Sequence, residues 1–170
     1  MSSLNAILTA WVRGTYAGSN DLSAVQAEFN ALSKTEITLT PGTSSGNADL
    51  IFMDTRTISA SSSENLDMAG SLTDPLGATL TFATIKAIYV KASSGNTNNV
   101  VVGGAGSNTL LGIFSDATDK IVVKPGGVFM WVAPATGAAV TASTGDILLV
   151  ANSSSGSSVT YDIVIIGTSA

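Results

Sequence analysis

Short apolar runs and polar turns alternate along the chain from about position 48 onwards. The stretch 80–102 shows this best, because β-branched residues flank a polar turn, Ser-Ser-Gly-Asn, at 93–96. Such turn residues adopt positive φ or bond to their own backbone, and β-branched flanks favour strands. The stretch therefore predicts two strands joined by a turn, and the rest of the chain repeats this theme.

Similar patterns predict a short strand before position 48 and about eight strands after it, at intervals of about 8–15 residues. These strands are expected at 36–40, 50–58, 64–68, 80–91, 97–102, 120–124, 128–133, 140–142, 147–152 and 159–167. No βαβ alternation is visible, which disfavours a parallel α/β sheet. The rhythm is typical of an antiparallel β-sandwich of jelly-roll or related Greek-key type.

Two details of pairing are also predicted. Apolar parity changes within 80–91, and a β-bulge near Thr84 would bring all its apolar positions to one face. Those positions are Leu80, Phe82, Ile85, Ala87 and Tyr89. The tight turn Pro125-Gly126-Gly127 predicts that 120–124 and 128–133 form a hairpin.

The first 34 residues have a helical pattern instead. Apolar residues at i, i+3, i+4, i+7 and i+8 predict a first helix; they are Leu4, Ile7, Leu8, Trp11 and Val12. A second helix is predicted at 21–34, with Asn20 or Asp21 as N-cap; its apolar positions are Leu22, Val25, Phe29 and Leu32. We therefore expect an N-terminal helical arm and linker at 1–47 and a β-sandwich domain at 48–170.

Several predicted strands have apolar residues at both odd and even positions, as at 128–132. A half-exposed antiparallel strand should instead alternate between apolar and polar residues. One outer sheet face is therefore expected to be covered, by the N-terminal helices or by another subunit. The arm either packs on its own domain or docks on a neighbour. In the second case the partner-contact residues are Leu4, Ile7, Leu8, Trp11 and Val12.

Composition supports an assembled protein. Hydrophobic residues make up 45% and charged residues 11% of the chain, against about 25% charged in typical domains. Mean hydropathy is +0.39, yet no apolar run approaches the roughly 20 residues of a spanning helix, so we expect no membrane partner. The net charge is −5, and the seven Lys and Arg residues are scattered, so we expect no nucleic-acid partner. The first residues lack the basic region of a secretory signal.

Candidate chemistry is sparse, because the chain has no Cys and no His. A Ser-His-Asp triad and thiolate or imidazole metal sites are therefore excluded. Carboxylates that could gather around Ca²⁺ are Asp116, Asp119, Asp146 and Asp162, but solvated turn carboxylates are the simpler reading. Glu64 and Asp67 as a glycosidase pair, or Trp11 and Trp131 as a sugar platform, are weaker still. Asp49, Asp54 and Arg56 are expected to form at most exposed pairs. We predict no catalytic, cofactor or metal site, and no enzyme.

Much of the chain from Ile58 onwards resembles tailed-bacteriophage structural proteins of jelly-roll type. The resemblance lies in ENLDM at 64–68 with LTD at 72–74, FATIKAIYVK at 82–91, NTNNVVVGG at 96–104, KPGGVFMWVAP at 124–134 and the segment 145–170. It implies a virion protein made in the bacterial cytoplasm and placed on the capsid exterior as a decoration (cement) protein. The implied partners are the major capsid protein and copies of itself, as a homotrimer. A tail or fibre component, or a carbohydrate-binding β-sandwich, are the alternatives.

Overall fold

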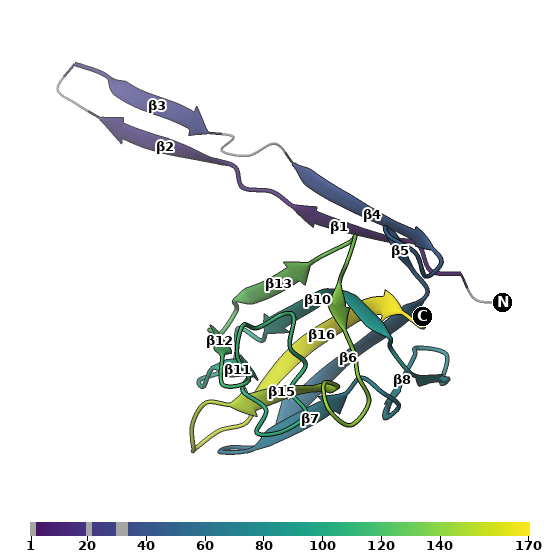
Figure 1. Ribbon diagram of the computed structural model, residues 1–170. Coiled ribbons are helices and arrows are strands. Elements are labelled where there is room, and N and C mark those ends of the chain that lie inside the picture. Colours follow the sequence, from purple (N-terminus) through teal and green to yellow (C-terminus); the bar gives the residue numbers. More distant parts are fainter. Residues whose placement is uncertain (1–2, 20–21, 30–33) are drawn as a thin grey trace.

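The computed structural model describes residues 3–19, 22–29 and 34–170, and contains only strands, turns and loops over these ranges. It has two visibly different parts (Figure 1). Most of the chain forms a β-sandwich-like body, and the N-terminal segment forms a long two-stranded ribbon that leads away from it.

Two antiparallel sheets make up the body. The five-stranded sheet has the order β13 (Val128–Val132), β10 (Thr84–Ala92), β16 (Val159–Thr168), β6 (Leu50–Ile58), with β14 (Ala138–Ala139) also beside β10. The four-stranded sheet has the order β12 (Lys120–Val123), β11 (Val100–Gly103), β15 (Ile147–Asn152), β7 (Ser63–Asp67). A small pair, β8 (Leu72–Thr73) with β9 (Thr79–Leu80), completes the body.

The main hydrophobic core lies between these two sheets. One sheet contributes alternate side chains such as Phe52, Ile88 and Ile163, and the other contributes Leu66 and Leu148. Alternation buries every second residue because successive side chains of a strand point to opposite faces. The expectation of an antiparallel β-sandwich-like fold is thus confirmed, as are the strands predicted at 36–40, 50–58, 64–68, 147–152 and 159–167.

The ribbon replaces the two predicted N-terminal helices, and that prediction is wrong. Its proximal half, called the proximal ribbon here, pairs β1 (Ala6–Ala10) with β4 (Thr35–Pro41). Its distal half, the distal ribbon, pairs β2 (Gly14–Ser19) with β3 (Ala24–Phe29). The short β5 (Asn47–Ala48) lies parallel to β4. Of the predicted second helix, positions 21 and 30–33 lie outside the described residues, as does the alternative cap at position 20.

The error has a physical reason. The apolar residues Leu4 and Leu8 are four apart, which fits a helical stripe, but they are also an even number apart, which fits one face of a strand. A strand forms because Leu8 pairs across the ribbon with Ile37, nearly 30 residues further along the chain. A local pattern contains no information about that partner.

The turn at 124–127 forms, yet the predicted hairpin does not. Gly127 N–H donates to the carbonyl of Lys124 at 2.8 Å, and Gly126 has φ 74°. Pro at the second position and positive φ at the third define a type II turn, whose twist splays the flanking strands. Accordingly, β12 and β13 lie in different sheets. The turn at 93–96 likewise carries the chain from β10 in one sheet to β11 in the other.

The predicted bulge exists, but it falls one to two residues later and its effect differs. The register of β10 against β16 shifts between Ile85 and Ala87. The extra residue, Lys86, is buried and its ammonium donates to the carbonyl of Ala135 at 2.8 Å. Ile85 faces the main core, whereas Ala87 and Tyr89 lie on the outer face of the sheet. The prediction that all five apolar positions share a face is therefore wrong.

Three strand boundaries also differ from the expectation. The strand predicted at 97–102 begins only at Val100, as β11. The predicted strand 80–91 is interrupted at 81–83, between β9 and β10, and the strand predicted at 140–142 is replaced by β14 two residues earlier. At Thr141 there is only an isolated bridge to Gly145.

Candidate interaction surface

The proximal ribbon packs across the outer face of the five-stranded sheet. Its register pairs Ala6 with Leu39 and Leu8 with Ile37, so these four residues share one face. That face, together with Leu4, packs into a second hydrophobic cluster against the sheet, whose sheet residues are Ile51, Ala87, Val132, Val164 and Ile166. This outer face was expected to be covered by N-terminal helices or by another subunit. The N-terminal segment covers part of it, and it does so with strands.

Only two of the five predicted partner-contact residues belong to this cluster. Leu4 and Leu8 pack against their own body. Ile7, Trp11 and Val12 are exposed, and the guanidinium of Arg13 lies 4.5 Å from the centre of the Trp11 ring. Their helical stripe does not exist, but their role in contacting a partner stays a prediction.

The distal ribbon continues past Ala10 with both faces solvated. Among its residues with described side chains, all but Gly14 are exposed, and Tyr16 reaches 77% exposure. Leu22, between β2 and β3, is 96% exposed. An isolated two-stranded ribbon is marginally stable in water. Such a ribbon gains order when one face packs on something else, which makes it the strongest candidate for an interaction element.

The register of the distal ribbon separates residue types. Tyr16 pairs with Ala27, and positions 14 and 18, both Gly, pair with positions 29 and 25. The alternate pairs are Thr15 with Glu28 and Ala17 with Gln26. Strand alternation assigns the two sets of positions to opposite faces. One face of the distal ribbon therefore has apolar and glycine positions, and the other has mainly polar ones. Reading this segment as a helix does not reveal the two sets of positions.

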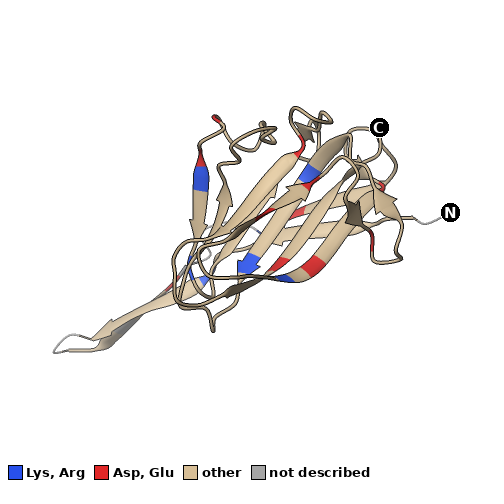
Figure 2. Ribbon diagram, turned by 90° about the horizontal axis from the view of Figure 1, so that it is seen from below, with Lys and Arg blue, Asp and Glu red and all other residues tan. Residues whose placement is uncertain are grey.

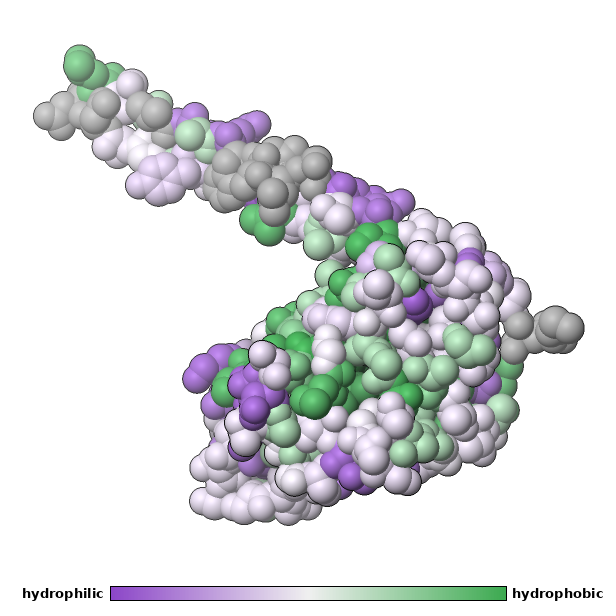
Figure 3. All heavy atoms as spheres, viewed as in Figure 1, coloured by the Kyte–Doolittle hydropathy of each residue, from purple (hydrophilic) through white to green (hydrophobic). Residues whose placement is uncertain are grey.

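The outer face of the five-stranded sheet is only partly covered. A row of four residues in register, Met130, Tyr89, Val164 and Met53, follows next on this face, and only its Val164 also packs against the proximal ribbon's cluster. Met53 is 55% and Met130 36% exposed, and Tyr89 is half-buried. Figure 3 shows hydrophobic residues where the ribbon meets the body and on the body beneath it. The next row contains Lys91 beside Asp162, which bound the apolar row on its polar side.

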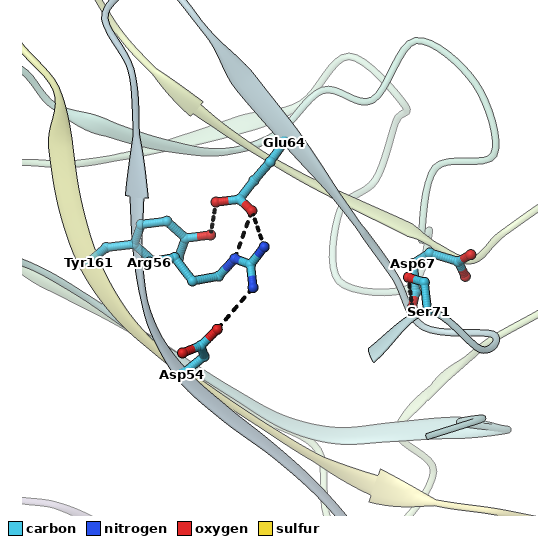
Figure 4. Close-up of polar contacts among 6 residues, drawn as sticks. All are labelled: Asp54, Arg56, Glu64, Asp67, Ser71 and Tyr161. Carbon is cyan, nitrogen blue, oxygen red and sulfur yellow. Dashed lines mark hydrogen bonds and ion pairs between the residues drawn. The ribbon is translucent and has the colours of Figure 1, made fainter. Parts of the chain in front are cut away.

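Charged residues are scattered across the body (Figure 2), and the main polar network is internal. Glu64 of β7 accepts from Arg56 of β6 at 2.7 Å and from the hydroxyl of Tyr161 at 2.9 Å (Figure 4). Arg56 also donates to Asp54 at 2.9 Å. The hydrogen bond to Glu64 raises the pKa of Arg56, and burial followed by the charge of Glu64 raises the pKa of Tyr161. Sequence reasoning missed the Glu64 contacts, which join residues up to 97 positions apart.

The carboxylates considered for catalysis or Ca²⁺ do not converge. Glu64 points to Tyr161, whereas Asp67 accepts from Ala69 N–H at 2.8 Å and lies apart from it in Figure 4. Asp116 and Asp119 belong to one exposed turn, where hydrogen bonds from Thr118 lower the pKa of Asp116. No cluster of three or more Asp, Glu, His or Cys residues suited to a metal ion occurs in the part of the chain that the structure describes.

The remaining candidates are structural as well. Trp131 packs against the main core, so it does not form a sugar-binding platform with Trp11. Asp146 is buried with Asp146 Oδ2 bound to Ser143 N–H at 2.6 Å, while Asp162 lies on the outer face and accepts from Thr55 at 2.8 Å. Asp49 pairs with Ser169, not with Arg56.

One cavity of about 180 Å³ opens between the start of the ribbon and the turn at 74–77. Its lining is mainly apolar, with Leu4, Leu50 and Leu80 among its residues. Its two carboxylates already accept backbone hydrogen bonds, Asp49 from Ser169 and Asp74 from Leu76. The cavity therefore offers no arrangement of unengaged catalytic groups.

Within the described ranges there is no helix long and apolar enough to cross a membrane. No protein-family model, no curated protein and no solved structure matches the chain. The features that bear on function are therefore the β-sandwich-like body and the ribbon.

Proposed function

We propose that this chain is a structural virion protein of a tailed bacteriophage, and specifically a capsid decoration (cement) protein that stabilises the head by binding across capsid subunits. Its partners would be the major capsid protein and further copies of itself, on the capsid exterior. This proposal depends above all on the ribbon, an element with exposed apolar side chains that extends from a β-sandwich-like body.

The strand order supports a jelly-roll version of this body. Its eight main strands form the orders 13-10-16-6 and 12-11-15-7, and the chain changes sheet between successive strands at every step except from β11 to β12. This order corresponds to two interleaved Greek keys, the arrangement found in viral capsid and lectin domains. The topology thus favours the virion hypothesis and, less directly, a carbohydrate-binding one.

The ribbon supports a role in binding across subunits. Extended arms let a protein contact a surface beyond its own body, and exposed aromatic and aliphatic side chains supply the apolar anchors of interfaces. Binding that occurs only on the assembled shell stabilises that shell by mass action. Closed symmetric oligomers are the norm, and a trimer would suit a three-fold position on a capsid.

The test is to purify phage particles from the host culture that carries the gene and to quantify the chain by mass spectrometry. We expect it at high copy number, comparable to that of the major capsid protein. A few copies per particle would instead assign it to the tail or a fibre. Its absence from particles, together with binding on a glycan array, would overturn the virion proposal in favour of the carbohydrate-binding alternative.

A matched variant tests the ribbon directly. Ala10 and Thr35 face each other across the ribbon, so a two-residue Asn-Gly turn can join them and remove only 11–34. This variant keeps the proximal ribbon on its sheet. We expect it to fold but to be lost from heads, and those heads to open at lower temperature. Unchanged incorporation would show that the distal ribbon is not the binding element.

A further inference from the structure

We infer that the outer face of the five-stranded sheet is a docking site for the distal ribbon of a second copy of this chain. The ribbon would lie along the row Met130, Tyr89, Val164 and Met53. This inference deepens the proposed function, which names further copies of this chain as partners, but the contact between copies does not require a capsid.

The molecule already contains a contact of this kind, between its own proximal ribbon and the same face of the sheet. The proximal ribbon packs Leu4, Ala6 and Leu8 into one cluster with the row next to the proposed site. That row is Val132, Ala87, Ile166 and Ile51, and Val164 of the proposed site lies at the edge of the same cluster. Leu4 and Ile51 also line the same cavity, which puts the start of β1 near β6. The cluster also contains Val132 of β13, which lies at the other end of that row. The proximal ribbon therefore runs across the strands, along a row.

The dimensions of the distal ribbon and of the row also match. Four strands spaced about 4.8 Å apart give a row about 14 Å long. Three positions on one face of a strand, i, i+2 and i+4, also span about 14 Å. Leu4, Ala6 and Leu8 meet this condition on the covered row, and positions 14, 16 and 18 of the distal ribbon meet it equally. The apolar and glycine face of the distal ribbon thus matches the length of the partly exposed row.

The two surfaces are also chemically complementary. Tyr16 is an exposed aromatic residue flanked by glycines at positions 14 and 18, which allow it to approach a flat surface closely. The row offers two thioethers and an aromatic ring, Met53, Met130 and Tyr89, and methionine sulfur packs favourably on aromatic rings. Lys91 and Asp162 form a polar rim with one charge of each sign, as interfaces commonly have.

The interface is heterologous, because a ribbon surface meets a different surface, the sheet face. Each copy therefore has one distal ribbon, called the donor here, and one sheet face that receives a ribbon, called the acceptor. The two surfaces can be disabled separately. Tyr16→Ser disables the donor. Met53→Lys with Met130→Lys disables the acceptor, at positions exposed enough to accept lysine.

The experiment is light scattering on the full chain over a range of concentrations, on each variant, and on their mixture. We expect the full chain to associate above its monomer mass of 17.1 kDa and each variant alone to remain monomeric. The mixture should regain a complex of twice the chain mass, since one intact donor meets one intact acceptor. A full chain that stays monomeric, variants that still associate, or a mixture without rescue would each overturn the inference.

Cysteine cross-linking gives a second measurement that does not depend on lysine substitutions. The natural chain has no Cys, so a Tyr16→Cys chain mixed with a Tyr89→Cys chain should form a disulfide-linked pair under mild oxidation. Val122→Cys, at an exposed position on β12 of the other sheet, is the matched control and should not cross-link with Tyr16→Cys. Equal cross-linking at 89 and 122 would contradict a defined docking site.

Discussion

The hydroxyl of Tyr161 on β16 donates a hydrogen bond of 2.9 Å to Glu64 on β7, and this contact joins the two sheets of the body. Glu64 is held at its other oxygen by Arg56, at 2.7 Å from Arg56 Nε. The tyrosine ring itself is fully buried in the core. A polar link of this kind specifies how the sheets are placed, since an apolar core alone tolerates sliding.

Tyr161→Phe should lower the free energy of unfolding by about 2 kcal/mol, because a hydrogen bond to a charged acceptor is lost while the ring remains. Urea denaturation at neutral pH measures this directly. Thr160→Val, on the opposite face of the same strand, is the control and should change stability by less than about 1 kcal/mol. An effect of Tyr161→Phe no larger than that of the control would mean that the link is not energetically significant.

Alkaline pH should destabilise the protein partly through the same residue. Burial raises the pKa of Tyr161 above its ordinary value of 10.0. The folded state then keeps the phenolic proton longer than the unfolded state does. This stabilisation is complete below about pH 10 and is lost at about 1.4 kcal/mol per pH unit above it.

The measurement is the urea midpoint at about pH 8 and about pH 11. We expect wild type to lose more stability over this interval than Tyr161→Phe, which has no phenol there. Lysine deprotonation affects both proteins alike. Equal losses in the two would show that Tyr161 does not ionise on unfolding.

The register shift in β10 makes a prediction about two adjacent residues. Ile88 faces the main core, whereas Tyr89 is half-buried on the outer face. Ile88→Ala should therefore cost about 2–5 kcal/mol through the cavity it leaves, and Tyr89→Ala markedly less. Thermal unfolding of the two variants decides between this assignment and the opposite parity, which would reverse their order.

How far the sequence predicts this molecule depends on whether the information is local. Alternation and turn residues predicted β6, β15 and β16 closely, because each of these patterns is complete within its own strand. The proximal ribbon was misread because Leu8 depends on Ile37 for its strand geometry. The hairpin at 120–133 was misread because a type II turn directs β12 and β13 to different sheets, although strong strand patterns flank it.

The interaction surface was only partly predictable for the same reason. The apolar spacing near the N-terminus predicted Trp11 and Val12 among the partner contacts, and these two are exposed in the structure. Tyr16 could have been found by reading β2 with period two, which isolates it between glycines at positions 14 and 18. The row Met130, Tyr89, Val164 and Met53 could not, because three pairings between distant strands create it.

Gly167 marks a point where two strands approach closely, and it should not tolerate a side chain. A Cβ there would lie 2.2 Å from the carbonyl oxygen of Thr84 and 2.8 Å from Phe82 Cδ1. Relief would require the backbone of β10 to move away from β16, at the end where β10 begins. Gly167→Ala should therefore lower the free energy of unfolding by about 1–3 kcal/mol, as overpacking does.

Gly18 in β2 provides the matched control for this substitution. It is also a strand glycine, but a Cβ there would meet nothing within 4 Å. Gly18→Ala should leave the urea midpoint of the body unchanged, while any effect on association would report on the ribbon. If Gly167→Ala were as harmless as Gly18→Ala, the close contact of β16 with Thr84 would be wrong, and with it the register from which the outer-face row is built.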